Sequence, residues 1–301
     1  MVDEAMITEV CPRDGFQNLE DFIETPIKIE IIEGLIQAGF QKIQLTSFVS
    51  PRAVPQMRDA GEISGYFVKK YPHISFTALV PNLFGAKAAY ESGIREISYV
   101  ISASEKHNLA NVRRSVKESL EELENIKENF GALRIKVDIA TAFGCPFEGY
   151  LPVQRVEELI HALLAMGVDE IYLADTIGVA NPKQVQEMMT YLKAVFPTVD
   201  FGFHMHDTRG MGLANILTLL KMGYGKFESA AGGLGGCPFA PGAAGNVASE
   251  DLVNMLDSMG VKTRIILKEL LKTDRIIEEK VKANLTSHMS KITSFMTGEI
   301  Q

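Results

Sequence analysis

His204 and His206 are the residues whose type and spacing most directly suggest chemistry. They follow the apolar, aromatic-rich run Val199–Phe203, which is typical of a buried strand. Side chains two positions apart in a strand point to the same face, so the two imidazoles would project together. Neighbouring imidazoles are a ready pair of ligands for a divalent metal. In isolation such a pair is more often two ordinary core or surface histidines, so further ligands must come from elsewhere in the chain.

Arg13 and Asp14 place a cation beside a hard oxygen ligand on adjacent residues. With His204 and His206, Asp14 would complete a set of two imidazoles and one carboxylate. Such a set suits Mg²⁺, Mn²⁺ or Zn²⁺ and leaves open positions for substrate oxygens. The alternative for the Arg–Asp pair alone is a turn at the surface.

The segment from residue 232 to residue 246 is the most unusual in composition because glycines recur throughout it. Glycines lose much conformational entropy when they are ordered, so their density predicts a loop that closes over a ligand. The segment carries Cys237, and a thiol under such a loop is a candidate acid or base. A purely structural loop is the alternative, which the position after the last predicted strand disfavours.

The elements that would position these residues alternate along the chain. Strands are predicted at Met6–Val10, Lys42–Thr46, Ile74–Val80, Glu96–Ile101, Arg134–Ala140, Glu170–Ala174, Asp200–Phe203 and Lys226–Ser229. Between the strands lie amphipathic stretches that predict helices, such as Ile27–Ala38, Ser115–Asn129, Val153–Met166, Pro182–Val195 and Leu213–Met222. Alternating strands and helices imply right-handed βαβ units and a parallel sheet. Units spaced by about 20 to 40 residues favour a (β/α)8 TIM barrel over an open doubly wound sheet. The open sheet would need a glycine-rich turn after its first strand, where this chain has Cys11–Gly15.

The barrel is predicted to span residues 1–263. Charged helical segments at Leu267–Lys272 and Asp274–Lys282 would form a C-terminal extension, residues 264–301, packed on the barrel within a single domain. Catalytic residues of such barrels gather where the strands end. The residues that follow or close predicted strands are Arg13, Asp14, Gln44 to Ser47, Asp175, Thr176, His204, His206 and the glycine-rich loop.

The composition is that of an ordinary globular protein with a sizeable core, at 46% hydrophobic and 23% charged residues. A formal net charge of -8 argues against a nucleic-acid partner. No apolar run approaches the roughly 20 residues of a membrane span, and the acidic N-terminus is unlike a signal peptide. Cys11, Cys145 and Cys237 are too few and too scattered for a disulfide framework. These features predict a cytoplasmic protein with reduced thiols.

Separated motifs recur in a definite order between about residue 6 and residue 270. They are Glu9–Asn18, Thr46–Pro51, Val54–Met57, Pro81–Leu83, Gly144–Gly149, Asp175–Gly178, His204–Asn215 and Gly233–Asp251. Together they resemble the 3-hydroxy-3-methylglutaryl-CoA lyase family, the acyl-CoA lyase branch of the metal-dependent lyase and Claisen-synthase TIM-barrel superfamily. The loop that carries Cys237 is the specific signal, because it separates these lyases from the synthases that share the Arg–Asp and H-x-H motifs.

The resemblance implies divalent-metal-dependent retro-Claisen cleavage of a 3-hydroxy-3-methylglutaryl-CoA-like thioester to acetyl-CoA and a keto acid, acetoacetate for the methylglutaryl substrate. It implies a Mg²⁺ or Mn²⁺ ion held by Asp14, His204, His206 and Asn246. The implied catalytic residues are Arg13, Asp14, Asp175, His204, Cys237 and Glu250. The implied substrate-binding residues are Arg13, Gln17, Gln44, Asn108, Lys136 and Thr176.

Two of these residues have definite implied roles. Arg13 would neutralise the enolate oxygen that develops as the carbon–carbon bond breaks. Cys237 would deliver or relay the proton to the acetyl-CoA enolate. By the same resemblance, a small acyl-CoA is the expected partner and a homodimer the expected assembly.

The sequence departs from the family pattern at several positions expected near the barrel mouth. Gln44 replaces a glutamate, and Lys136 and Asp138 replace an arginine and a tyrosine. Ala174 replaces a glycine, and Leu19–Glu20 alters the loop after the Arg–Asp motif. We therefore expect the reaction to be retained, while the acyl group could be that of another 3-hydroxyacyl-CoA. The sequence also leaves open a Claisen-type synthase and a non-catalytic homologue that binds a metal or an acyl-CoA.

Overall fold

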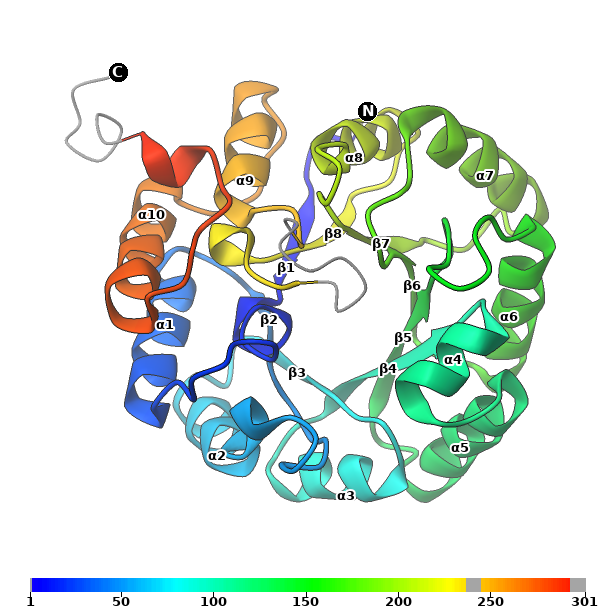
Figure 1. The fold of residues 1–301 in the computed structure, drawn as a ribbon, viewed down its shortest axis with the longest axis horizontal. Helices are drawn as coiled ribbons and strands as arrows, with labels where there is room; N and C mark the ends of the chain where they lie inside the picture. The colour runs from blue at the N-terminus through cyan, green and yellow to red at the C-terminus, as the bar shows by residue number, and fades with distance from the viewer. Residues whose placement is uncertain (1, 237–244, 293–301) are drawn as a thin grey trace.

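The computed structural model describes residues 2–236 and 245–292. Parallel strands pair in chain order and close into a barrel in which β1 lies beside β8 (Figure 1). The strands are β1 Met6–Glu9, β2 Lys42–Ser47, β3 Ser75–Leu79, β4 Glu96–Ser102, β5 Arg134–Ala140, β6 Glu170–Asp175, β7 Gly202–Met205 and β8 Lys226–Ser229. The predicted (β/α)8 barrel is confirmed, and the strand ends differ from the predicted ones by at most about two residues.

Helices surround the barrel on its outer side (Figure 1). They are α1 Thr25–Gln37, α2 Ala60–Lys70, α3 Leu83–Glu91, α4 Glu105–Val112, α5 Val116–Asn129, α6 Val153–Met166, α7 Pro182–Val195, α8 Gly212–Lys221, α9 Ser249–Ser258 and α10 Leu267–Ile276. Short helical turns are η1 Cys11–Gly15, η2 Pro55–Met57, η3 Ala231–Gly233, η4 Ile277–Val281 and η5 Met289–Lys291. Helices α2, α3, α4 and α9 have no counterpart among the predicted helices.

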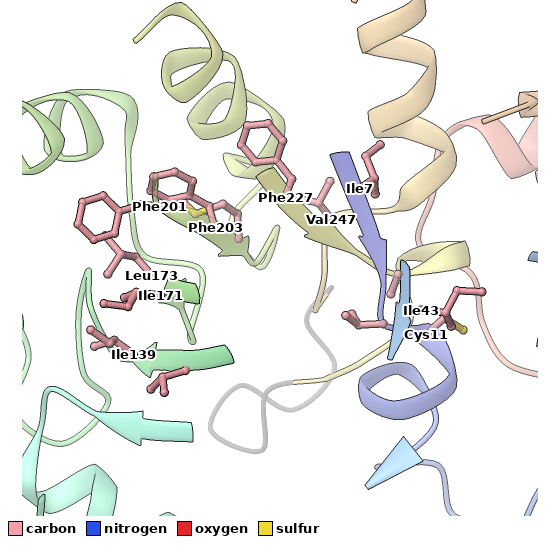
Figure 2. Close-up of a cluster of buried hydrophobic side chains, with 14 of the residues drawn as sticks. Ile7, Cys11, Ile43, Ile139, Ile171, Leu173, Phe201, Phe203, Phe227 and Val247 are labelled. Carbon is pink, nitrogen blue, oxygen red and sulfur yellow. The ribbon is translucent and has the colours of Figure 1, made fainter. Parts of the chain in front are cut away.

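Strand alternation sets which side chains of β7 face the barrel interior. Phe203 packs outward on the rings of Tyr224 and Phe227, with centroids 5.2 Å and 6.3 Å apart. Figure 2 shows Phe203 and Phe227 within the apolar cluster around these strands. Because neighbouring side chains of a strand point to opposite faces, His204 points into the barrel.

The C-terminal extension packs on the first helix of the barrel. Helix α10 lies beside α1 (Figure 1), and the backbone N–H of Ile266 donates to the carbonyl of Ala38 at 2.7 Å. Gly34 makes the close approach possible, since a Cβ there would lie 2.5 Å from Oγ1 of Thr273. The two predicted C-terminal segments form α10 followed directly by η4. The division at residues 263 and 264 stays a prediction.

Within residues 2–236 and 245–292, none of the helices combines the length and the apolar character needed to cross a membrane.

Candidate metal centre and active site

The residues predicted as metal ligands come together at the ends of β1 and β7. Asp14, His204 and His206 each offer a ligand atom, and these atoms lie within 4.8 Å of one another. The two Nε2 atoms of the histidines are 3.0 Å apart. Asn246 forms an isolated β-bridge with His206, and its Nδ2 donates to Oδ2 of Asp14 at 2.7 Å. The π-helical turn η1 delivers Asp14 to this point directly after β1.

The donor atoms of this cluster fit a divalent cation. Nδ2 of Asn246 donates to Asp14 and to the carbonyl of Leu234, while its Oδ1 is buried and has no partner within the described part of the chain. Two imidazole nitrogens at 3.0 Å, one carboxylate and one free amide oxygen form a mixed nitrogen and oxygen set. Such a set suits Mg²⁺, Mn²⁺ or Zn²⁺.

Burial and neighbouring charges shift the pKa values of these residues in different directions. Burial would lower the pKa of His204, but its hydrogen bond to Glu228 and the charge of that carboxylate outweigh burial, and the pKa is raised. Burial, followed by the neighbouring His204, lowers the pKa of His206 to about 3, so its imidazole is neutral at pH 7. Burial would raise the pKa of Asp14, but the charges of Arg13 and His204 and the hydrogen bond from Asn246 outweigh it, and the net shift is downward. Asp14 is therefore an ionised carboxylate.

Arg13 is held from two sides. Its Nε donates to Oε1 of Gln44, and its Nη1 donates to Oδ1 of Asp14. Nε2 of Gln17 also lies 3.3 Å from Oδ1 of Asp14. Gln44 is fully buried, and its Nε2 has no hydrogen-bond partner among the residues that the structure describes. The predicted residues Arg13, Gln17 and Gln44 thus form one assembly with Asp14, the candidate metal ligand.

Lys136 and Asp138 are buried, and their expected position facing the barrel mouth stays a prediction. They lie inside the barrel, 1% and 6% exposed. Nζ of Lys136 donates to Oδ1 of Asp138 at 2.8 Å and to Oε1 of Glu228. Lys136 makes these two contacts because a buried ammonium is stable only when carboxylates neutralise it. Substrate binding by Lys136 stays a prediction.

Glu228 is a site residue that the sequence reasoning missed. Its Oε2 lies 2.9 Å from Nδ1 of His204, and it is 1% exposed. Burial would raise the pKa of Glu228, but Lys136 and His204 outweigh it, and the pKa is lowered. One signal in the sequence could have identified it. A glutamate is unusual inside a predicted buried strand, and this one lies shortly before the glycine-rich loop.

Asp175 and Thr176 shape the loop after β6. The two carboxylate oxygens of Asp175 accept the backbone N–H groups of Val179 and Ala180, each at 3.0 Å. Burial raises the pKa of Asp175 to about 6. Oγ1 of Thr176 accepts the backbone N–H of Thr141 at 2.8 Å. Both residues therefore fix backbone at the end of the barrel where the metal ligands lie.

Asn108 and Glu250 also bind backbone. Oδ1 of Asn108 accepts the N–H of Ser102 at 3.0 Å, and its Nδ2 donates to Oγ of Ser119 at 2.7 Å. Both carboxylate oxygens of Glu250 lie 3.1 Å from the backbone nitrogen of Gly232. Glu250 thus anchors the start of the glycine-rich segment. Contact of either residue with a substrate stays a prediction.

Cys237, the predicted proton donor, lies outside the described residues. The residues just before it reach the metal ligands. Gly235 approaches so closely that a Cβ there would lie 2.4 Å from Nδ2 of Asn246 and 3.2 Å from Oδ2 of Asp14. The carbonyl of Gly236 accepts a hydrogen bond from Nδ2 of Asn18 at 3.0 Å.

Comparison with known proteins decides the family. The model of the HMGL-like family matches residues 4–277. The chain belongs to the HMGL-like family. This HMGL-like protein is 43% identical over 283 residues to a hydroxymethylglutaryl-CoA lyase of Bacillus subtilis, covering 93% of this chain and 94% of that one. It is therefore a lyase, as the motifs predict.

Solved structures agree with this assignment. The crystal structure of a Bacillus subtilis HMG-CoA lyase is similar with a TM-score of 0.93 at 41% identity, covering 98% of this chain and 100% of that one. The structure of an HMG-CoA lyase of Acinetobacter baumannii in complex with coenzyme A and 3-methylmalate is also similar, with a TM-score of 0.91 at 39% identity. The match covers 96% of this chain and 95% of that one.

Proposed function

We propose that this protein cleaves 3-hydroxy-3-methylglutaryl-CoA, or a closely related 3-hydroxyacyl-CoA, to acetyl-CoA and a keto acid. For the methylglutaryl substrate the keto acid is acetoacetate. The observation that carries the proposal is the cluster of Asp14, His204, His206 and Asn246 with the guanidinium of Arg13 bound to it. The names of the relatives support the substrate class.

The reaction breaks the bond between the carbinol carbon and the carbon next to the thioester. As the hydroxyl loses its proton, its oxygen forms the new carbonyl, and the electrons of the broken bond pass to the acetyl-CoA enolate. A divalent cation, which we propose is Mg²⁺ or Mn²⁺, polarises the hydroxyl when it is bound. The enolate then takes up a proton, and we propose Cys237 as its donor or relay.

Arg13 is suited to stabilise the enolate oxygen. Gln44 fixes its Nε and Asp14 fixes its Nη1, so the guanidinium is held in place before the reaction begins. Donors that need no rearrangement stabilise developing charge more effectively than mobile ones. His206 contributes by remaining neutral, which leaves its ring nitrogen free to bind the cation.

An acyl-CoA substrate is further supported by the Acinetobacter baumannii relative, whose structure contains coenzyme A. We also propose a homodimer and a cytoplasmic location, on the basis of family resemblance and composition, respectively.

The test is an assay of the purified protein with Mg²⁺ or Mn²⁺ and a panel of 3-hydroxyacyl-CoA thioesters that carry a carboxylate. We expect acetyl-CoA and acetoacetate in equal amounts from the methylglutaryl thioester, and loss of turnover by at least about a hundredfold in Asp14→Asn. A chelator should abolish activity, and added Mn²⁺ should restore it.

Two outcomes would overturn the proposal. Absence of any thioester product from the whole panel, with Mn²⁺ bound, would identify a non-catalytic homologue. Condensation of acetyl-CoA with a 2-keto acid, without cleavage of the panel, would identify a synthase.

A further inference from the structure

A line of buried polar contacts runs from the metal ligand His204 into the barrel. Nδ1 of His204 lies 2.9 Å from Oε2 of Glu228, and the other oxygen of Glu228 accepts from Nζ of Lys136. Lys136 also donates to Asp138 at 2.8 Å, and Oγ of Ser98 donates to Asp138. None of these side chains is open to solvent.

The apolar residues next to His204 and Glu228 show which face of the strands these two polar residues occupy. Figure 2 shows Phe203 and Phe227 together in the apolar cluster. His204 and Glu228 are the next residues of β7 and β8, and they pair in register across the two strands. Because side chains alternate between the two faces of a strand, His204 and Glu228 both point toward the barrel interior, where they contact each other.

We propose that Glu228 is a positioning residue for the metal ligand His204, and that Lys136 and Asp138 hold Glu228 in place rather than bind substrate. The inference rests on the metal site of the proposed function and adds the residues that orient one of its ligands.

The chemistry of the imidazole gives Glu228 this task. An ionised carboxylate only accepts hydrogen bonds, so Nδ1 of His204 must carry the proton. When the ring is neutral and binds the cation, Nε2 of His204 presents its lone pair, and this is the atom that lies 3.0 Å from Nε2 of His206. A carboxylate that fixes the second nitrogen of a metal-binding histidine orients the ring and strengthens the ligand.

Lys136 has no charge left for a substrate carboxylate. Its Nζ donates hydrogen bonds to Asp138 and Glu228. The same nitrogen lies 4.4 Å from the centroid of the Tyr172 ring. Lys136 and Asp138 are also two of the departures from the family pattern. Since they contact each other, they form one coupled change that keeps Glu228 neutralised.

The barrel contains a second buried lysine that serves as a matched control. Nζ of Lys42 lies 2.5 Å from Glu96 and 2.7 Å from Glu170. Like Lys136, it is buried and bridges two carboxylates. Unlike Lys136, it has no ion pair with a residue that contacts the metal cluster among those described.

The experiment compares Mn²⁺ binding in Glu228→Gln, Glu228→Ala and Lys136→Met with binding in Lys42→Met. Folded protein is titrated with Mn²⁺ and free ion is measured by electron paramagnetic resonance, while circular dichroism checks the fold. We expect the Glu228 and Lys136 variants to raise the Mn²⁺ dissociation constant by about 10- to 100-fold. We expect Lys42→Met to lose stability but change that constant by less than about threefold. With saturating Mn²⁺, the KM of Lys136→Met for the thioester should stay near the wild-type value.

The outcomes separate this inference from the proposed function. Wild-type Mn²⁺ affinity in both Glu228 variants would overturn the positioning role. An equal loss of Mn²⁺ affinity in Lys42→Met would also overturn the positioning role. Removal of any buried lysine would then weaken Mn²⁺ binding, whether or not it contacts Glu228. A raised KM with unchanged Mn²⁺ affinity in Lys136→Met would make Lys136 a substrate-binding residue. Absence of Mn²⁺ binding by the wild type would overturn the metal site itself.

Discussion

Arg13 keeps its orientation through one charged and one neutral partner. Asp14 supplies the charge at Nη1, and Gln44 supplies only an amide oxygen at Nε. The amide also brings a buried Nε2 that has no partner within the described residues. An unsatisfied buried donor of this kind costs about 1–3 kcal/mol. Gln44 is therefore a weaker holder of Arg13 than the glutamate of the family pattern would be.

We predict that Gln44→Glu raises kcat/KM for 3-hydroxy-3-methylglutaryl-CoA by about three- to tenfold. The carboxylate would make a charge-assisted hydrogen bond to Arg13 and remove the unpaired donor. Steady-state kinetics over the thioester panel measures the effect. Gln44→Leu, which removes the acceptor as well, should lower kcat/KM. A Glu variant slower than wild type on every thioester would show that the amide is needed.

Residue type and spacing predicted the cluster of candidate metal ligands because its members carry recognisable chemistry. His204 and His206 are two apart at the end of β7, and Asp14 and Asn246 lie in motifs that the family shares. Glu228 was missed because its significance depends on partners from other strands. Strand register brings His204 beside it, and Lys136 reaches it from β5. A single sequence does not encode that pairing in any local pattern.

Glycine at position 235 lets the backbone lie close to Asn246 and Asp14, two of the candidate metal ligands. Its φ is +109°, and a Cβ would lie 2.4 Å from the amide nitrogen of Asn246. Gly223, between α8 and β8, has a similar φ of +94°, but an added Cβ there would have no neighbour within 4 Å among the residues that the structure describes. An alanine at either position would strain the backbone, but only an alanine at position 235 would also clash with Asn246.

We predict that Gly235→Ala weakens Mn²⁺ binding by about tenfold or more, whereas Gly223→Ala leaves it unchanged. Both variants carry a left-handed backbone strain of about 1–2 kcal/mol, so both should lower the melting temperature. Mn²⁺ titration and thermal unfolding are measured on the same samples. Equal Mn²⁺ affinity in the two variants would contradict a steric role for Gly235.

At the level of elements, the strands were predictable and several helices were not. Most strand residues are buried, and every strand contains β-branched or aromatic residues, which favour strands. Helix α2 contains Gly61 and Gly65, and α4 is short and polar, with Glu105, Lys106 and Asn108 in its first turns. Helices of this kind gain their stability from packing on the barrel, which a sequence pattern alone does not show.

A cluster of buried acids joins the barrel to its outer helices. Burial raises the pKa of Glu9 in β1 and of Glu250 in α9 to about 7. Burial, together with Glu250 and Glu9, raises the pKa of Asp274 in α10 well above its ordinary value. In the unfolded chain these acids lose their protons at lower pH, so between about pH 4.5 and pH 7 the folded state binds more protons. The unfolding free energy must therefore fall as pH rises through this window.

We predict a fall on the order of a few kcal/mol between about pH 5 and pH 8 for the wild type, and a smaller fall for Asp274→Asn. The variant removes one titrating acid and its repulsion of the others. Urea unfolding at a series of pH values measures the slope. Asp3→Asn, at an exposed position, should follow the wild type. A slope in Asp274→Asn equal to or steeper than that of the wild type would contradict the assignment.

The closure of β1 against β8 has a consequence for how the protein is made. The hydrogen bond between Asn246 and Asp14 joins residues 232 positions apart, and His204 and His206 also come from the last quarter of the barrel. During synthesis the first ligand leaves the ribosome long before the other three exist. If these four residues bind the proposed ion together, the complete site forms only when the end of the barrel reaches its beginning, so we expect metal retention by a nascent chain to report that the barrel has closed.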